Sequence, residues 1–247
     1  MTTTLHIRPI RFVLVLTLIA LALAVISWAV VAYEWSLGVD NTYWVAEASS
    51  LFNVTFEGNV PTWYTSLLML IAAFLSLLIA TYTIQKQLRW RIHWVGLMLL
   101  FFYLSLDEAA AIHEIFTSPT REAFNTSGYL HFSWILVGVP VAIGIALLFL
   151  PFVLNLPAKT RNAFLLAGVI YLLGAVGVET IGANMWYETD GLVTPRYTAV
   201  GGVDEFLEMF GVILTIYGLL VYLDTQISNI NIQFGTAKKE DDNVPSS

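Results

Sequence analysis

Residues 12–33 read FVLVLTLIALALAVISWAVVAY, a stretch of 22 residues without a charge. A helix needs about 20 mainly apolar residues to cross the roughly 30 Å hydrocarbon core of a bilayer. Arg11 precedes the stretch and Glu34 follows it. The apolar stretch is longer than the usual core of a secretory signal peptide, so we interpret it as a membrane anchor that is not cleaved.

The rest of the chain repeats this pattern. The 247 residues are 57% hydrophobic and only 12% charged, which lies outside the range of soluble globular domains. The apolar stretches are too long for barrel strands and lack their alternation. Because a helix satisfies its own backbone hydrogen bonds in lipid, the sequence predicts an all-α fold, a six-helix transmembrane bundle. The expected spans are residues 12–33, 62–85, 92–113, 131–152, 163–186 and 203–223.

The basic residues predict how the bundle is oriented. Nine of the eleven lysines and arginines fall on one side of a six-span arrangement. The positive-inside rule assigns that side to the cytoplasm, so both termini are expected inside. We expect one transmembrane domain over residues 1–225 and a polar, disordered cytoplasmic tail over residues 226–247.

Other classes of protein are disfavoured by composition. The chain has no basic patch that would indicate a nucleic-acid partner. It has no cysteine, which excludes disulfides, thiolate zinc sites and thiol catalysis. In the first outer loop, residues 34–61, the apolar groups 43–45 and 51–52 predict a short helix lying in the membrane interface.

Carboxylates interrupt three of the six spans. The uncharged runs at residues 92–106, 162–178 and 209–223 hold 15, 17 and 15 residues, too few to cross a bilayer alone. Each of these helices must therefore carry the acid at the outer end of its run, Asp107, Glu179 or Glu208, into the membrane. We expect these acids about 6–9 Å below the outer surface. A carboxylate at the centre of a membrane helix costs ~2.5–3.5 kcal/mol, and neighbouring carboxylates repel. We therefore expect one pocket, opening outward, in which protons, a cation or water stabilise these acids.

This pocket predicts a metal site. Carboxylate and imidazole ligands together suit iron, manganese or zinc, whereas carboxylates alone suit calcium or magnesium. If residues 105–114 continue as one helix, Asp107, Ala111 and Glu114 share a face and His113 points elsewhere. The candidate metal ligands are Asp107, Glu108, His113, His131, Glu179, Glu205 and Glu208.

The leading hypothesis is a membrane-embedded metalloenzyme that acts on a lipid or another lipophilic small molecule. Asp107 or Glu205 would then serve as general base or would orient a ligand. One alternative is a transporter coupled to protons or cations, and another is an accessory subunit of a larger membrane complex. The simplest alternative is that these acids are only hydrated groups near the mouths of the helices.

Two motifs support the architecture. Residues 59–66, NVPTWYTS, and residues 105–114, SLDEAAAIHE, resemble a family of uncharacterised bacterial multi-pass membrane proteins. The resemblance covers the second and third spans well and the other spans loosely. It implies a bacterial source and no activity. With six spans, we expect the protein in the inner (plasma) membrane of the cell.

Overall fold

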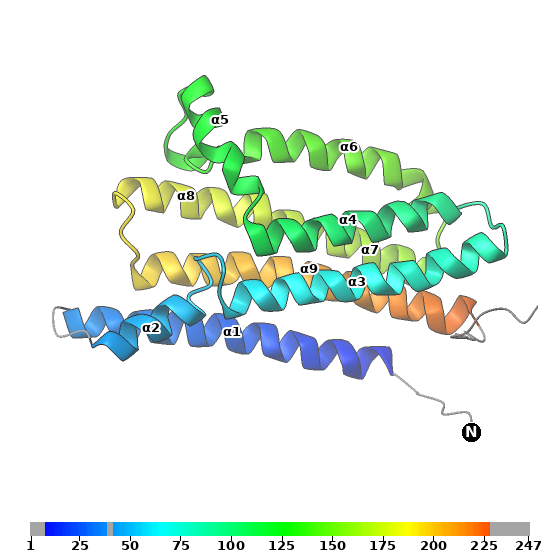
Figure 1. The fold of residues 1–247 in the computed structure, drawn as a ribbon, viewed down its shortest axis with the longest axis horizontal. Coiled ribbons are helices and arrows are strands. Elements are labelled where there is room, and N and C mark those ends of the chain that lie inside the picture. The colour runs from blue at the N-terminus through cyan, green and yellow to red at the C-terminus, as the bar shows by residue number, and fades with distance from the viewer. Residues whose placement is uncertain (1–7, 39–41, 228–247) are drawn as a thin grey trace, which may run out of the picture.

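The computed structural model describes residues 8–38 and 42–227, and this part of the chain is built from helices without a strand. Six helices in the described part are long and apolar enough to cross a membrane, which confirms the predicted six-span bundle. Figure 1 shows them side by side along the long axis of the molecule. They are α1 (Pro9–Leu37), α3 (Val60–Gln85), α4 (Arg91–Ala110), α6 (Ile135–Leu154), the continuous run Ala158–Glu188, and α9 (Pro195–Gln226).

The fifth span has three parts. They are α7 (Ala158–Leu172), the π-helical segment η4 (Leu173–Val178) and α8 (Glu179–Glu188). The shorter helices are α2 (Tyr43–Phe52), the 3₁₀ turn η2 (His113–Phe116), α5 (Thr117–Phe124) and the 3₁₀ turn η3 (Gly128–Leu130). Helix α2 corresponds to the short helix predicted in the first outer loop.

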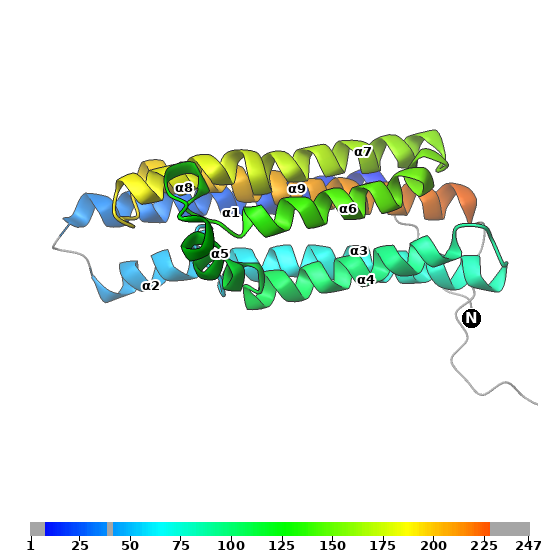
Figure 2. The same cartoon turned by 90° about the horizontal axis from the view of Figure 1, so that it is seen from above.

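The two ends of the bundle differ in charge. At one end, which we call the basic end, lie the start of α1, the α3–α4 turn, the α6–α7 turn and the end of α9 (Figures 1 and 2). The two turns and the helix starts that follow them carry Lys86, Arg89, Arg91, Lys159 and Arg161. Toward the other end, which we call the acidic end, lie α2, α5 and α8 (Figure 2).

Helix α9 is the centre of the bundle. It packs against α1, α3 and α7, and its residues Met209, Ile213, Ile216 and Leu219 are almost completely buried. Side chains of the outer helices instead expose large apolar surfaces, such as Leu147 and Leu148 on α6. This arrangement suits a helix bundle whose solvent is lipid, because the apolar side chains face outward as well as inward.

Two spans begin with the same local signal. The side chain of Asn59 caps α3 by accepting a hydrogen bond from the backbone N–H of Thr62 at 3.1 Å. The Thr194 hydroxyl caps α9 in the same way, accepting from the backbone N–H of Tyr197 at 3.1 Å. Each helix also has a proline in its first turn, where no N–H is needed for the helix ladder.

The structure corrects several predicted span boundaries. The sixth span was expected to begin at residue 203, but α9 begins at Pro195, and the fifth begins at Ala158 instead of residue 163. The third span was expected to reach residue 113, but α4 ends at Ala110. The fourth span was expected to begin at His131, but α6 begins at Ile135 after the turn η3. Most of the predicted tail, from residue 228 onward, lies outside the described residues.

Candidate metal centre

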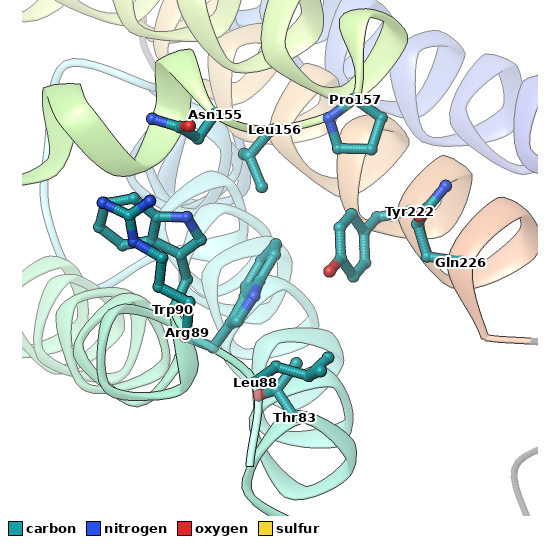
Figure 3. Close-up of a pocket in the computed structure, with 10 residues that line it drawn as sticks. Thr83, Leu88, Arg89, Trp90, Asn155, Leu156, Pro157, Tyr222 and Gln226 are labelled. Atoms are coloured by element: carbon teal, nitrogen blue, oxygen red, sulfur yellow. The ribbon is translucent and has the colours of Figure 1, made fainter. Parts of the chain in front are cut away.

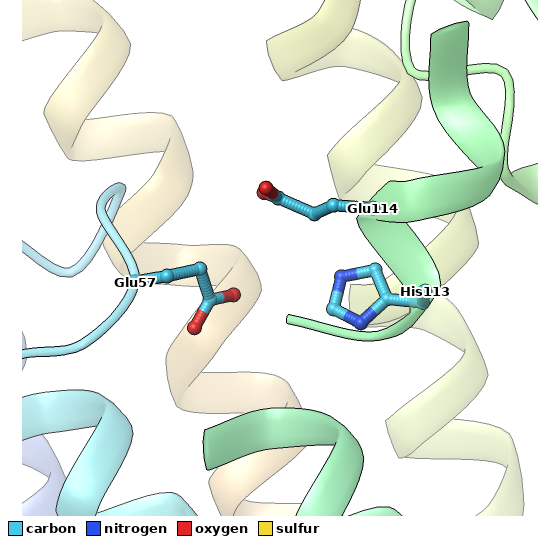
Figure 4. Close-up of side chains that lie close together, drawn as sticks. All are labelled: Glu57, His113 and Glu114. Carbon is cyan, nitrogen blue, oxygen red and sulfur yellow. The ribbon is translucent and has the colours of Figure 1, made fainter. Parts of the chain in front are cut away.

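Three side chains at the acidic end can hold a metal ion together. They are Glu57 from the loop before α3, and His113 and Glu114 from η2. One ligand atom from each residue lies within 4.8 Å of the other two. Figure 4 shows both carboxylates and the outer edge of the His113 ring facing the same space. We refer to these three residues as the outer triad.

A carboxylate fixes the histidine of the outer triad. Asp107 accepts two hydrogen bonds from His113: one at 2.8 Å from the backbone N–H to Oδ1, and one at 3.0 Å from ring Nδ1 to Oδ2. Because Nδ1 donates to a carboxylate, Nε2 is left as the nitrogen that can bind a metal. A carboxylate in this position both selects the tautomer and orients the ring of a ligating histidine.

This contact exists because the chain leaves the helix at Ala111. That residue adopts a left-handed backbone conformation (φ 49°, ψ 43°), and α4 ends one residue before it. The chain then turns back, so that the side chain of Asp107 reaches the backbone and the ring of His113. The prediction that residues 105–114 form one helix, with Ala111 and Glu114 on the face of Asp107 and His113 elsewhere, is therefore wrong.

Charges around His113 change its protonation. Burial alone would lower the pKa of His113, but the hydrogen bond and charge of Asp107, with the charges of Glu179 and Glu57, raise that pKa to about 9. Partial loss of solvent around the Glu57 carboxyl group raises its pKa, and nearby Glu114 contributes in the same direction. In the absence of a metal, His113 therefore carries a proton at neutral pH, and its positive charge partly compensates the negative charges of Glu57 and Glu114.

Further acids lie in the helices next to the outer triad. Glu108 interacts electrostatically with Glu57, His113 and Glu208, which links the triad to α9. We refer to the acids on the spans as the inner acids. They are Glu108 on α4, Glu179 at the start of α8, and Asp204, Glu205 and Glu208 on α9, and each is within electrostatic reach of at least one other.

Neutral partners hold two of the inner acids. The indole Nε1 of Trp134 donates a 2.8 Å hydrogen bond to Oε1 of Glu179. The same indole contacts the ring of His113, with 4.9 Å between ring centroids, so Trp134 joins the two groups of residues. The Tyr171 hydroxyl interacts with the carboxyl group of Glu208. By contrast, Oδ1 of Asp204 is buried and has no hydrogen-bond partner among the described residues.

The π-helical segment brings the fifth span against α9. A Cβ atom on Gly174 would lie 2.8 Å from the backbone oxygen of Asp204 and 3.1 Å from Cγ of Glu208. Only glycine therefore allows the two backbones to approach at this point. Wide turns of this kind are frequent at functional sites, and this one directly precedes Glu179.

One predicted ligand lies apart from the others. His131 follows the turn η3, where its ring contacts Phe132 and Tyr187, and its backbone oxygen accepts two hydrogen bonds from Arg121, at 3.0 Å and 2.7 Å. Burial and the charge of Arg121 lower the pKa of His131. Asp107, Glu108, His113, Glu179, Glu205 and Glu208, in contrast, lie in one electrostatic neighbourhood.

Two residues of the outer triad were not among the predicted ligands. Glu57 lies in a loop 56 residues before His113, and no sequence spacing indicates that the two meet. The position of Glu57 is set by Asn59, whose side-chain amide donates to the backbone oxygens of Asn53 and Phe56 at 2.6 Å and 2.8 Å. In the sequence, the NVPT motif at the start of α3 therefore indicates where this loop ends, but not that Glu57 meets His113.

The profile of one protein family, described as a domain of unknown function (DUF8692), matches residues 13–223. Because the match covers most of the chain and all six spans, the chain belongs to this family. No curated protein and no solved structure matches the chain.

Proposed function

We propose that this member of the DUF8692 family binds a divalent metal ion at the acidic end of its bundle. The observation that carries the proposal is the outer triad: three ligand atoms within 4.8 Å of one another, one of them on a histidine fixed by Asp107. A ring fixed in this way loses little freedom when it binds a metal, and this favours affinity.

The ligand types favour zinc, manganese or iron. Two carboxylates and one imidazole form a mixed oxygen and nitrogen set, whereas calcium and magnesium prefer oxygen alone. Three protein ligands leave one position of a tetrahedral ion for water, which is the arrangement of catalytic rather than structural zinc sites. The proposed ion is therefore one that can activate a water molecule.

The inner acids support a cation at this end of the bundle. Five carboxyl groups in adjoining helices repel one another unless protons or a cation compensate their charge. Oδ1 of Asp204 is buried without a hydrogen-bond partner among the described residues, an arrangement that is costly unless that oxygen is protonated or near a cation. Glu108 interacts electrostatically with Glu57 and His113 of the outer triad and with Glu208 of the inner acids, so it would couple a cation held by the triad to the acids on the spans.

We infer that the substrate is lipophilic, with the protein in the inner (plasma) membrane. The outer triad lies beside the end of α4 and the start of α3, which we take as the level of the lipid headgroups. The helices around it expose apolar side chains such as Leu106 on α4 and Val137 on α6. A reactive group near the headgroup of a lipid can reach a site at this level without leaving the membrane. A metal-dependent reaction on such a substrate is the activity that the geometry favours.

A transporter has less support. Coupled transport requires a polar path between the two ends, with the binding site near the middle of the membrane. In this bundle Ile213, Ile216 and Leu219 fill the centre below the inner acids. The acids are confined to one end, which is more consistent with a site that is reached from one side.

Elemental analysis of the detergent-purified protein tests the proposal. The wild type is expected to retain close to one equivalent of zinc, manganese or iron, and Glu57→Gln and Glu114→Gln are each expected to lose most of it. Glu122→Gln changes an exposed acid on the neighbouring α5 and is the matched control, which should retain the metal. Metal-free wild-type protein that also fails to bind any of the three added ions would refute the proposal.

A further inference from the structure

A second candidate binding site lies at the basic end, opposite the outer triad. A cavity of about 370 Å³ opens there between the α3–α4 turn, the α6–α7 turn and the end of α9. Figure 3 shows Arg89, Trp90 and Asn155 on one side of this cavity, and Tyr222 and Gln226 on the other. We refer to it as the basic-end pocket.

The charge of the basic-end pocket is positive. Arg89 is the one charged side chain among the described residues that line the pocket, and none of them is acidic. Its guanidinium carbon lies 4.7 Å from the centroid of the Trp90 ring, a cation–π contact that holds the exposed side chain at the rim. The nearby acid of α9, Asp224, is exposed to solvent.

Two helices add to this positive potential. Trp90 precedes α4 and Pro157 precedes α7, and both line the pocket. Neither residue caps its helix with a side-chain hydrogen bond, and neither first turn holds an acid. At the start of α4 the N–H groups of Arg91 and His93 donate to the backbone oxygens of Leu88 and Trp90, at 3.3 Å and 3.0 Å, so the start of α7 contributes more. Free N–H groups at a helix start carry a partial positive charge and suit an anion. Together with the Arg89 guanidinium on the rim, they make the pocket suited to a phosphate group.

The remaining lining suits an amphiphile. Leu88, Trp94 and Leu156 give the pocket apolar walls, and the amide groups of Asn155 and Gln226 add neutral hydrogen-bonding groups. One N–H of the Asn155 side-chain amide donates to the backbone oxygen of Pro151 at 2.8 Å, which leaves the second N–H and Oδ1 for a ligand. A headgroup that carries a phosphate and hydroxyl groups matches this combination.

The position of the pocket identifies the source of the phosphate. The spans beside the pocket end at this level, where lipid headgroups lie, and the two turns with the helix starts that follow them carry five basic residues. Basic pockets between membrane helices on the cytoplasmic side are suited to acidic headgroups. We propose that the basic-end pocket binds the phosphate of an anionic phospholipid with a hydroxylated headgroup, such as phosphatidylglycerol. This inference is independent of the metal centre at the other end.

Native mass spectrometry of the full-length protein in neutral detergent tests the proposal. We expect one phosphatidylglycerol to be retained in preference to phosphatidylcholine, and Arg89→Ala to weaken this retention about fivefold or more, since one base near a membrane surface contributes ~1 kcal/mol. Lys86→Ala removes a base of the same turn that does not line the pocket, and is expected to bind like the wild type. Equal retention by the wild type and Arg89→Ala, or equal losses in the two variants, would overturn the proposal.

A measurement on the unmodified protein complements the variants. Phenylglyoxal modifies accessible arginines, and the modified positions can be located by peptide mass spectrometry. Phosphatidylglycerol is expected to protect Arg89 while Arg161 stays reactive, and phosphatidylcholine is expected to protect neither. Protection of Arg89 by millimolar inorganic phosphate alone, at the same level, would identify a free anion rather than a lipid as the ligand and would overturn the lipid assignment.

Discussion

The carboxylate of Asp107 lies 3.0 Å from Nδ1 of His113, and the two side chains are only 15% and 25% exposed. The pair forms because the helix ends between them, at Ala110. It leaves Nε2 of the imidazole directed at Glu57 and Glu114 (Figure 4). The orientation of this ring is the basis of the proposed metal centre.

Replacement of Asp107 by asparagine is expected to weaken metal binding about 10- to 100-fold without abolishing it, because partners that orient a ligand typically have effects of this size. The amide can still contact the backbone N–H of His113, but it no longer fixes the protonated nitrogen. Competition with a chromophoric chelator measures the affinity. An affinity equal to that of the wild type would show that Asp107 does not orient the histidine.

Metal affinity is expected to rise with pH. The pKa of His113 is raised to about 9, so at neutral pH a metal ion must displace a proton from the ring. Affinity should therefore increase up to about tenfold per pH unit from pH 7 and level off near pH 9. Calorimetric titrations in buffers of different ionisation enthalpy count the released proton. The same pH dependence in His113→Ala would assign the proton to another group.

The metal-free protein is expected to lose stability over the same range. The folded pKa of His113 lies above the ordinary value of 6.5, so the ion pair with Asp107 contributes fully below about pH 6.5. This contribution is lost as the pH rises through about 9. Thermal unfolding of the chelator-treated wild type should fall more steeply between pH 6.5 and pH 10 than that of His113→Gln. Parallel curves for the two proteins would contradict this assignment.

The close approach of the fifth span to α9 is expected to depend on Gly174. In Gly174→Ala the new methyl group would lie 2.8 Å from the backbone oxygen of Asp204, so the helices must separate, at a cost of about 1–3 kcal/mol. Gly168→Ala on α7 is the matched control because a Cβ there meets nothing within 4 Å. We expect a lower unfolding temperature and weaker metal binding for Gly174→Ala, and no loss for Gly168→Ala. Equal behaviour of the two variants would argue against the tight crossing.

Much of the fold is predictable from the sequence, because lipid restricts what an apolar stretch of about 20 residues can form. The common depth of the acids in three spans is also predictable, because it follows from the positions of the charges in the sequence and the helix rise per residue. It indicates that Glu108, Glu179 and Glu208 come from helices that must meet at one end.

The outer triad itself could not be predicted, for two physical reasons. A left-handed alanine costs about 1–2 kcal/mol, so nothing in the AAA sequence at 109–111 indicates that the helix ends there. The cost is offset by the bonds between Asp107 and His113, which are visible only in three dimensions. The contact of Glu57 with the η2 turn is likewise a tertiary event between segments far apart in the chain.

The two histidines of the acidic end provide the most direct test of the metal centre. Zinc titration of the metal-free protein, followed by calorimetry, should be done on the wild type, His113→Ala and His131→Ala. The account predicts one site in the wild type and in His131→Ala, with affinities that agree within about threefold, and at least a hundredfold weaker binding in His113→Ala. Equal binding by all three proteins, or loss of binding in His131→Ala alone, would contradict it.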